Sequence, residues 1–426
     1  MTIAILFGSF FFLVLIGLPI ALSLGAASLL TIVLTTNMPT NTIIQNAFTS
    51  LDSFPLMAIP FFILAGALMS SGGISRRLLD LASVLVGYLV GGLAMVTVVA
   101  SMFFSAISGS GPATVAAIGS FMIPSMKQRN YGEGFAAAIT AASGSIGVLI
   151  PPSIPFVMYG VVGSVSIGSM FLAGILPGII LGFCLLIVAY AISKKNKYVG
   201  TGKPPTFMDV LKALNEAKYA LLIPVIILGG IYAGIFSATE SAAVAAVYAL
   251  FIGVFVYKEL NIKSLYQSIA QAAITNSTTV IIIGFSISFA YLMTMERIPN
   301  TIADFIVGIS ESPIIIMLVI NVFLLIVGMF IDTISALVIL TPILLPVVTN
   351  IGIDPVHFGV ILVTNLAIGF ITPPLGVNLF VASGVGKVPF ESISKAIIPI
   401  FLVMIIALLV ITYVPELSTF IPSLAD

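Results

Sequence analysis

Side-chain hydroxyls, amides and glycine-flanked carbonyls gather at four interruptions of otherwise apolar segments. In the first half these are Ser105, Ser108, Ser110, Thr114, Ser143, Ser145 and Gly147, and in the second half Asp332, Thr333, Ser335, Asn365, Gly369, Thr372 and Asn378. Glycine lets the backbone turn its carbonyls inward, and the His and Cys clusters that transition metals favour are absent from these segments. We therefore expect Na⁺ to bind there, with close helix packing by small residues as the structural alternative.

Asp332 is the only acidic residue that we place deep within an apolar layer. Inserting such a residue at the centre of a membrane helix costs about 2.5–3.5 kcal/mol, so an ionisable residue in this position indicates a functional site. We expect its carboxylate to coordinate a cation or to accept hydrogen bonds from substrate hydroxyl groups. The structural alternative is that Asp332 caps the helix that follows it.

The elements that must position these residues recur at a fixed spacing of 222 residues. This shift superposes Gly147 on Gly369, Pro151-Pro152 on Pro373-Pro374, and Ser110 on Asp332. Two consecutive prolines cannot continue a helix, and a bilayer tolerates such a break only where the freed backbone groups face a cavity, an ion or other protein. Matching broken helices in two halves indicate the midplane binding site of a transporter.

Composition and charge predict several membrane spans. Apolar residues make up 60% of the sequence, charged residues only 7%, and the mean hydropathy is +1.27, whereas soluble domains carry about 25% charged residues. The N-terminus lacks the basic region and cleavage site of a signal peptide, so we expect it to be retained as a span. The expected topology places 14 of the 15 basic residues in the cytoplasm and only Arg297 outside, as the positive-inside rule requires.

We predict an all-α polytopic membrane protein built as an inverted repeat. Residues 1–192 and 219–426 form the halves, joined by a basic cytoplasmic linker at 193–218, and residues 3–34 fold into two helices at Gly17 and Pro19. Each half then holds a third span (54–70 and 270–293), an amphipathic stretch (74–90 and 298–311), a re-entrant hairpin (93–126 and 313–348), a broken helix (134–163 and 356–384) and a final span (169–192 and 396–414). The loop after the first hairpin is basic and its counterpart is not, so the halves have opposite orientation.

Other functional classes fit the sequence poorly. A net charge of zero offers no basic surface for nucleic acid, and no GxxxxGK[ST] loop is present for a nucleotide. An intramembrane aspartyl protease needs two midplane aspartates, and a serine type would pair Ser110 or a neighbour with His357. That histidine follows Asp354-Pro355 at a helix start, so we expect it at the surface or in a capping role. We therefore expect a transporter and not an enzyme.

Six segments, in order, resemble the large membrane subunit of tripartite ATP-independent periplasmic (TRAP) transporters. They are PFFILAGALM, SAISGSGPATVAAIGSFMIP, AASGSIGVLIPPSIPFVMYG, GIFSATESAAVAAVYAL, GMFIDTISALVILTPILLPV and IGFITPPLGVNLFV. The resemblance covers essentially the full chain and departs from the family at Ser237-Ala238-Thr239-Glu240, where threonine-proline-threonine-glutamate is usual. It implies a bacterial inner-membrane carrier that moves an organic acid inward with a Na⁺ gradient, by an elevator-type motion.

The resemblance also implies sites and partners. One Na⁺ would lie near Ser108, Gly147 and Pro151, a second near Asp332, Gly369 and Thr372, and the substrate between them near Ser110, Ser153 and Asp332. The partners would be a small four-helix membrane subunit and a periplasmic substrate-binding protein, both separate polypeptides. Family substrates include sialic acid and four-carbon dicarboxylates, and the lack of Arg or Lys in the expected site mildly favours sialic acid. The nearest alternative is a single-component Na⁺-coupled dicarboxylate or citrate carrier with the same inverted-repeat plan.

Overall fold

The computed structural model describes residues 2–36, 38–200, 204–298, 301, 308 and 312–424, and these form helices joined by turns, with no strand among them. Eight helical segments of the described chain are long and apolar enough to cross a membrane: 54–71, 167–195, 207–232, 238–256, 262–295, 313–330, 333–350 and 390–413. The predicted all-α membrane fold is therefore confirmed.

The first half begins with helices that the apolar pattern largely predicts. They are α1 (Thr2–Leu15), α2 (Ile20–Thr35), α3 (Asn41–Leu51), the 3-10 turn η1 (Phe54–Met57), α4 (Ala58–Ser71) and α5 (Ile74–Val86). The predicted turn at Gly17 and Pro19 is confirmed, and Gly17 has a φ of +88° that glycine adopts without strain. The pattern did not predict α3, a short amphipathic helix with one buried residue, Ile43.

The remaining first-half helices follow the predicted breaks. They are α6 (Gly92–Ser108), α7 (Gly111–Gln128), α8 (Glu133–Ser145), the turn η2 (Ile146–Val148), α9 (Ile154–Gly163) and α10 (Ile167–Lys195). The first hairpin breaks at Gly109 and Ser110, and the first broken helix is interrupted from Ile146 to Ser153. Both interruptions lie where the sequence predicts them.

The second half repeats this order. It contains α11 (Phe207–Tyr232), α12 (Ala238–Phe251), the π-helical turn η3 (Ile252–Val256), α13 (Ile262–Met295), α15 (Pro313–Phe330), α16 (Thr333–Asn350), α17 (Pro355–Gly369), α18 (Val377–Gly386), α19 (Phe390–Tyr413) and α20 (Glu416–Thr419). The second hairpin breaks at Ile331 and Asp332, one residue before the break at Asp332-Thr333 that the sequence predicts. Most of the predicted amphipathic stretch 298–311 lies outside the described residues.

The segment between the halves contains more helix than we predicted. Helix α11 begins at Phe207, so residues 207–218 are helical. Thr206 and Asp209 form a capping box that satisfies the first backbone amides of this helix: the Asp209 amide donates to Thr206 Oγ1 (3.3 Å) and the Thr206 amide donates to Asp209 Oδ2 (2.9 Å). A polar sequence therefore did not mean an irregular chain here.

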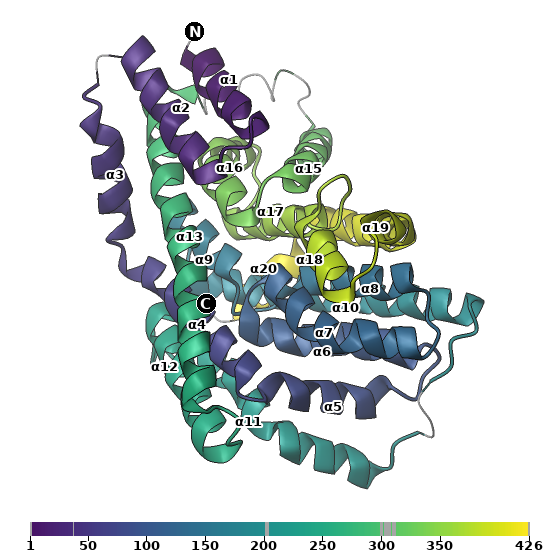
Figure 1. Cartoon of the computed structure of the whole chain (residues 1–426). Coiled ribbons are helices and arrows are strands. Elements are labelled where there is room, and N and C mark those ends of the chain that lie inside the picture. Colours follow the sequence, from purple (N-terminus) through teal and green to yellow (C-terminus); the bar gives the residue numbers. More distant parts are fainter. Residues whose placement is uncertain are drawn as a thin grey trace.

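The helices pack as two groups (Figure 1). The scaffold group consists of α1–α5 and α11–α13, in which α4 packs against α12 and α13. The tip group consists of α6–α10 and α15–α20, which includes both hairpins and both broken helices. In Figure 1 α13 runs down the picture beside α2. The helices that run roughly at right angles to it, across the picture, include α6, α7, α17 and α19. The groups meet where α13 packs on α16 and where α4 and α5 pack on α6.

Candidate functional site

The tip of the first hairpin holds three oxygen atoms within hydrogen-bonding distance of one another. Helix α6 ends at Ser108, Gly109 adopts a φ of +61°, and Ser110 is extended. The Ser108 and Thr114 hydroxyl oxygens are 2.9 Å apart, and Thr114 Oγ1 donates to the Ser110 carbonyl oxygen at 2.8 Å. The predicted residues Ser108 and Ser110 are thus brought together, with Thr114 as the residue that joins them.

The first break packs directly against this tip. A Cβ atom on Gly147 would lie 2.7 Å from Thr114 Oγ1 and 2.8 Å from the Ser110 carbonyl oxygen, so only glycine fits. The amide of Ile154 donates to the Gly109 carbonyl at 3.3 Å. The first tip and the first break therefore form one site.

Four other predicted residues of the first half lie in the surrounding helices and turn. Ser105 and Ser143 are fully buried, and each hydroxyl donates to the carbonyl four residues earlier, on Ser101 (2.5 Å) and Ile139 (2.6 Å). Ser153 caps α9, because its hydroxyl accepts from the Phe156 amide (3.3 Å) and donates to the Val148 carbonyl (2.6 Å). Pro151 is buried in the turn between η2 and α9.

Asp332 caps α16 at the second tip. Its Oδ1 accepts from the backbone amides of Ile334 (3.0 Å) and Ser335 (3.1 Å), and its Oδ2 accepts from the Ser335 hydroxyl (2.5 Å). The capping geometry of the structural alternative is therefore present. A carboxylate oxygen has more than one lone pair, so these bonds leave room for a further partner.

The second tip and the second break approach each other through two glycines. A Cβ on Gly369 would lie 2.5 Å from the Cα of Gly328, which precedes Asp332 by one helical turn. The Thr372 hydroxyl donates to the Ile368 carbonyl at 2.8 Å. Close backbone contact between α15 and α17 thus positions this break beside its tip.

Asn365 belongs to a separate buried network. Its Nδ2 donates to Asn321 Oδ1 (2.7 Å) and to the Ile361 carbonyl (2.9 Å), and Asn321 Nδ2 donates to Thr412 Oγ1 (3.0 Å). Asn321 lies eleven residues, about 16 Å of helix, before Asp332. The structure therefore does not place Asn365 with the second tip, and the sequence did not indicate its partner Asn321.

The predicted surface position of His357 is wrong. The side chain is 1% exposed, and Nε2 lies 3.2 Å from the Thr412 carbonyl. Asp354 caps the start of α17 instead, accepting from the Val356 and His357 amides. Packing of α17 against α19 buries the histidine, which its place near a helix start did not reveal.

A cavity of about 160 Å³ lies between the two tips. The first residues of three helices line it: Gly111 and Pro112 of α7, Ile154 and Pro155 of α9, and Thr333 and Ile334 of α16. Ser110, Asp332, Val148 and Phe370 are also in its wall, and Ser153 is not. Because helix N-termini carry partial positive charge, three of them facing one cavity favour an anionic group.

A second cavity, of about 710 Å³, continues from the first and shares Ser110, Pro112, Ile154 and Ile334 with it. It runs between α4, α7 and α13 as far as Ser75, Ser120 and Gln271. On α13 it is lined by Gln271, Thr275 and Thr279, spaced four residues apart. Sequence reasoning missed these three, although a polar stripe at helical spacing in an apolar helix was a readable signal.

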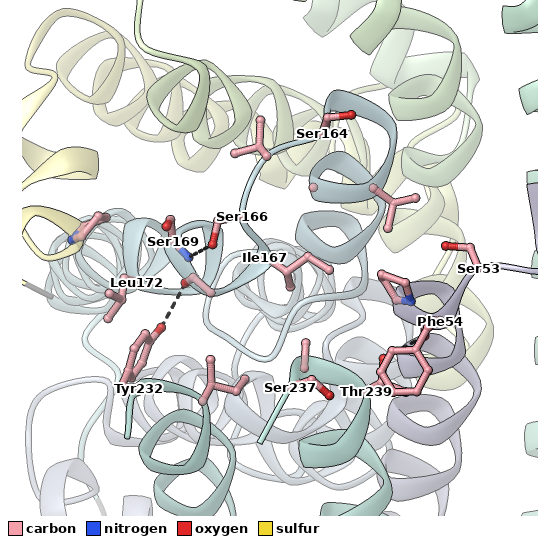
Figure 2. A pocket seen from close by; sticks show the side chains of 18 residues that line it. Ser53, Phe54, Ser164, Ser166, Ile167, Ser169, Leu172, Tyr232, Ser237 and Thr239 are labelled. Atoms are coloured by element: carbon pink, nitrogen blue, oxygen red, sulfur yellow. Dashed lines mark hydrogen bonds between the residues drawn. The ribbon is translucent and has the colours of Figure 1, made fainter. Parts of the chain in front are cut away.

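A third cavity, of about 800 Å³, shares no lining residue with the other two (Figure 2). It lies among the start of α10, the end of α11 and the start of α12, and is lined by Ser166, Tyr232 and Thr239 among others. In Figure 2 the Tyr232 hydroxyl donates to the Gly168 carbonyl at 3.1 Å. Among side-chain hydrogen bonds between described residues, this bond alone joins the scaffold group to the tip group.

Comparison with known proteins identifies the relatives of this chain. The family model for the DctM component of the tripartite ATP-independent periplasmic transporter matches residues 7–417. The isethionate TRAP transporter permease DctMQ of Oleidesulfovibrio alaskensis is 51% identical over 98% of this chain, which spans 66% of that relative's length. The sialic acid TRAP permease SiaM of Vibrio cholerae is 39% identical, covering 96% of this chain and 95% of that one. The C4-dicarboxylate TRAP permease DctM of Pseudomonas aeruginosa is 40% identical over 94% of each chain.

A solved structure shares the fold. The Alcanivorax borkumensis YdaH transporter superposes with a TM-score of 0.63 at 13% identity, covering 90% of this chain and 88% of that one.

Proposed function

The chain belongs to the DctM-component family of TRAP transporters, and we propose that it is the large permease subunit that imports a small organic acid with Na⁺. It is a multi-pass permease of the bacterial inner membrane and not an enzyme. The observation that carries the substrate class is the convergence of the first residues of α7, α9 and α16 on one cavity. These three N-termini come from both halves and offer an anion partial positive charge without an Arg or Lys.

The residues at the first tip fit Na⁺. The donor set consists of oxygen atoms only, from the Ser108 and Thr114 hydroxyls and the Ser110 carbonyl, beside a glycine whose Cβ would fill the space. Within the described residues there is no group of His, Cys, Asp or Glu suited to a transition metal or a divalent ion. Ser108, Thr114 and the Gly147 turn would hold one ion, and Asp332, Gly369 and Thr372 would hold a second. The ions would offset the negative charge of substrate bound between the tips.

We propose a small acid as the substrate. The cavity between the tips is only about 160 Å³, and the 51% identical relative is named for isethionate, a small hydroxy-sulfonate. A four-carbon dicarboxylate is the second candidate, because the 40% identical relative is named for that class. Sialic acid, which the lack of basic residues first favoured, is larger and fits this cavity less well.

We further propose that the tip group moves as a unit against the scaffold group, in an elevator motion, with both hairpins re-entrant. The positive-inside rule assigns Arg76, Arg77 and the linker lysines to the cytoplasm. The 710 Å³ cavity leads from the tips toward Ser75, which precedes these arginines on α5. The conformation is then the inward-facing one, and the cavity in Figure 2 lies on the periplasmic side.

Two partners follow from the family. A tripartite transporter pairs a large permease with a small membrane subunit and a periplasmic binding protein, and we propose that this chain needs both. The alternative, a single-component carrier, would transport without them. Reconstitution in vesicles separates the two, because full uptake by the purified chain alone would favour the single-component carrier.

Sodium coupling is tested in the same vesicles. With both partners present, uptake of radiolabelled isethionate or succinate should require an inward Na⁺ gradient and no ATP. Uptake that is unchanged when K⁺ or choline replaces Na⁺ would exclude the proposed coupling.

A further inference from the structure

Asn378 carries a buried oxygen atom that has no partner. The side chain lies at the start of α18 and is fully buried. Its Nδ2 donates to the Ala141 carbonyl and to Ser145 Oγ, both at 3.2 Å. Its Oδ1 has no hydrogen-bond partner among the described residues. A buried amide oxygen without a partner keeps its desolvation penalty uncompensated, so this atom needs an explanation.

The orientation of this amide is fixed by chemistry. A backbone carbonyl can only accept a hydrogen bond, so the atom that faces the Ala141 carbonyl must be the NH₂ group. Turning the amide over would place Oδ1 against that carbonyl, where two acceptors repel. The oxygen of Asn378 therefore faces away from the body of α8.

The surroundings of Asn378 belong to the first tip, although Asn378 itself is in the second half. A Cβ on Gly111, the first residue of α7, would lie 3.4 Å from Asn378 Nδ2 and 3.3 Å from the Gly144 carbonyl oxygen. Gly147, which packs against the Ser110 carbonyl and Thr114, is two residues beyond Ser145. The backbone amide of Asn378 also donates to the Phe370 carbonyl at 3.0 Å, which ties it to the second break.

We infer that Asn378 Oδ1 is a ligand of the cation at the first tip, supplied across the repeat by the second half. An amide oxygen is a hard, neutral ligand of the kind that the Ser108, Thr114 and Ser110 oxygens already provide. The end of α8 beside it carries partial negative charge, which also favours a cation. The inference rests on the proposed Na⁺ coupling and deepens it.

This assignment gives the two halves a shared ion. The amide NH₂ of Asn378 donates to α8 of the first half and its backbone amide donates to the second break. In this assignment its oxygen is then the ligand of the first ion. Filling that site would therefore favour one spacing between the two breaks. The substrate cavity lies between the same elements, with Gly111 and Phe370 in its wall.

The test compares Na⁺ activation with substrate affinity in the complete reconstituted transporter. The variants are Asn378→Leu, which keeps the size of the side chain, and Asn378→Ala, which avoids a clash if leucine prevents folding. We expect either variant to raise the Na⁺ concentration for half-maximal uptake at least tenfold. The substrate KM at saturating Na⁺ should stay within about twofold. Ser145→Ala, which removes one of the two acceptors of Nδ2, should give a smaller shift in the same direction.

Asn276→Leu is the matched control. The side chain is on α13 in the scaffold group, and its Oδ1 is also buried without a partner, so a general effect of losing such an amide would appear there too. An unchanged Na⁺ requirement in folded Asn378 variants overturns the inference, and so does a rise in substrate KM alone, which would place the oxygen on the substrate. The Na⁺ dependence of the unmodified transporter is measured before any variant. If its uptake does not need Na⁺, the proposed coupling itself fails.

Discussion

Replacing Gly147 by alanine tests the first site most directly, because the added atom enters the contact between tip and break. The Cβ would lie 2.7 Å from Thr114 Oγ1 and 2.8 Å from the Ser110 carbonyl oxygen, against 3.4 Å for an ordinary contact. The shortfalls are 0.7 and 0.6 Å. Thr114 can turn its side chain, but the Ser110 carbonyl is backbone, so the tip itself must move.

The expected cost follows from this displacement. Overpacking a well-packed contact by one methyl group destabilises a protein by about 1–3 kcal/mol, and a binding site keeps its function only within about 0.5 Å of its geometry. Gly147→Ala should therefore remain folded at a lower melting temperature. It should lose at least tenfold in uptake, with a higher Na⁺ concentration for half-maximal rate.

Gly384→Ala is the control for the Gly147 experiment. Gly384 is also helical and in the tip group, but a Cβ there meets nothing within 4 Å. Alanine is favoured over glycine in a helix interior by up to about 1 kcal/mol, so this variant should be as stable or slightly more stable, with normal uptake. Normal uptake and Na⁺ dependence in Gly147→Ala would refute our reading of the tip and break as one ion site.

The remaining predictions concern the second tip and the boundary between the groups. Asp332→Asn should still cap α16, since asparagine is an equally good N-cap, but uptake should fall tenfold or more because a hydrogen bond or ion contact to a charged group contributes about 1.5–3 kcal/mol. Wild-type uptake with unchanged Na⁺ dependence would show that Asp332 only caps its helix. Tyr232→Phe removes the hydrogen bond to the Gly168 carbonyl, which stabilises the conformation described here by about 0.5–1.5 kcal/mol. The equilibrium between this conformation and the other state of the proposed motion should therefore shift away from it by up to about tenfold. Slower thiol labelling of Ser120→Cys, in a Cys184→Ser background, would report that shift, and an unchanged rate would mean that both states keep the bond.

The sequence predicted the helix interruptions well because their causes are local. Pro-Pro pairs break a helix wherever they occur, and the 222-residue shift located both tips and both breaks. The contact of Gly147 with the first tip could also have been predicted from the sequence, since a glycine beside a break often marks a close approach of the backbone. Helix starts were less predictable: Phe207 begins α11 inside a polar segment because the Thr206–Asp209 capping box outweighs composition.

What the sequence could not give was the direction in which each side chain points. Ser153 was expected at the substrate, but its hydroxyl closes its own turn by bonding the Val148 carbonyl. Asn365 was expected at an ion site, and it bonds Asn321, a residue 44 positions away. His357 was expected at the surface, and α19 covers it. The bond of Ser153 is local, within its own turn, whereas the outcomes for Asn365 and His357 depend on contacts between helices distant in sequence, which periodicity and spacing do not encode.

The boundary between the two helix groups has a consequence for the resistance to their motion. A boundary held by many directed bonds moves in steps, because each bond must break before the next can form. Here the described residues provide one such side-chain bond, Tyr232 to Gly168, and elsewhere, as where α13 packs on α16, helices of mostly apolar sequence meet without one. Apolar contact has no preferred direction, so these surfaces can slide with little internal friction. The drag on the proposed motion would then come mainly from the surrounding lipid, and transport rate should follow the fluidity of the bilayer.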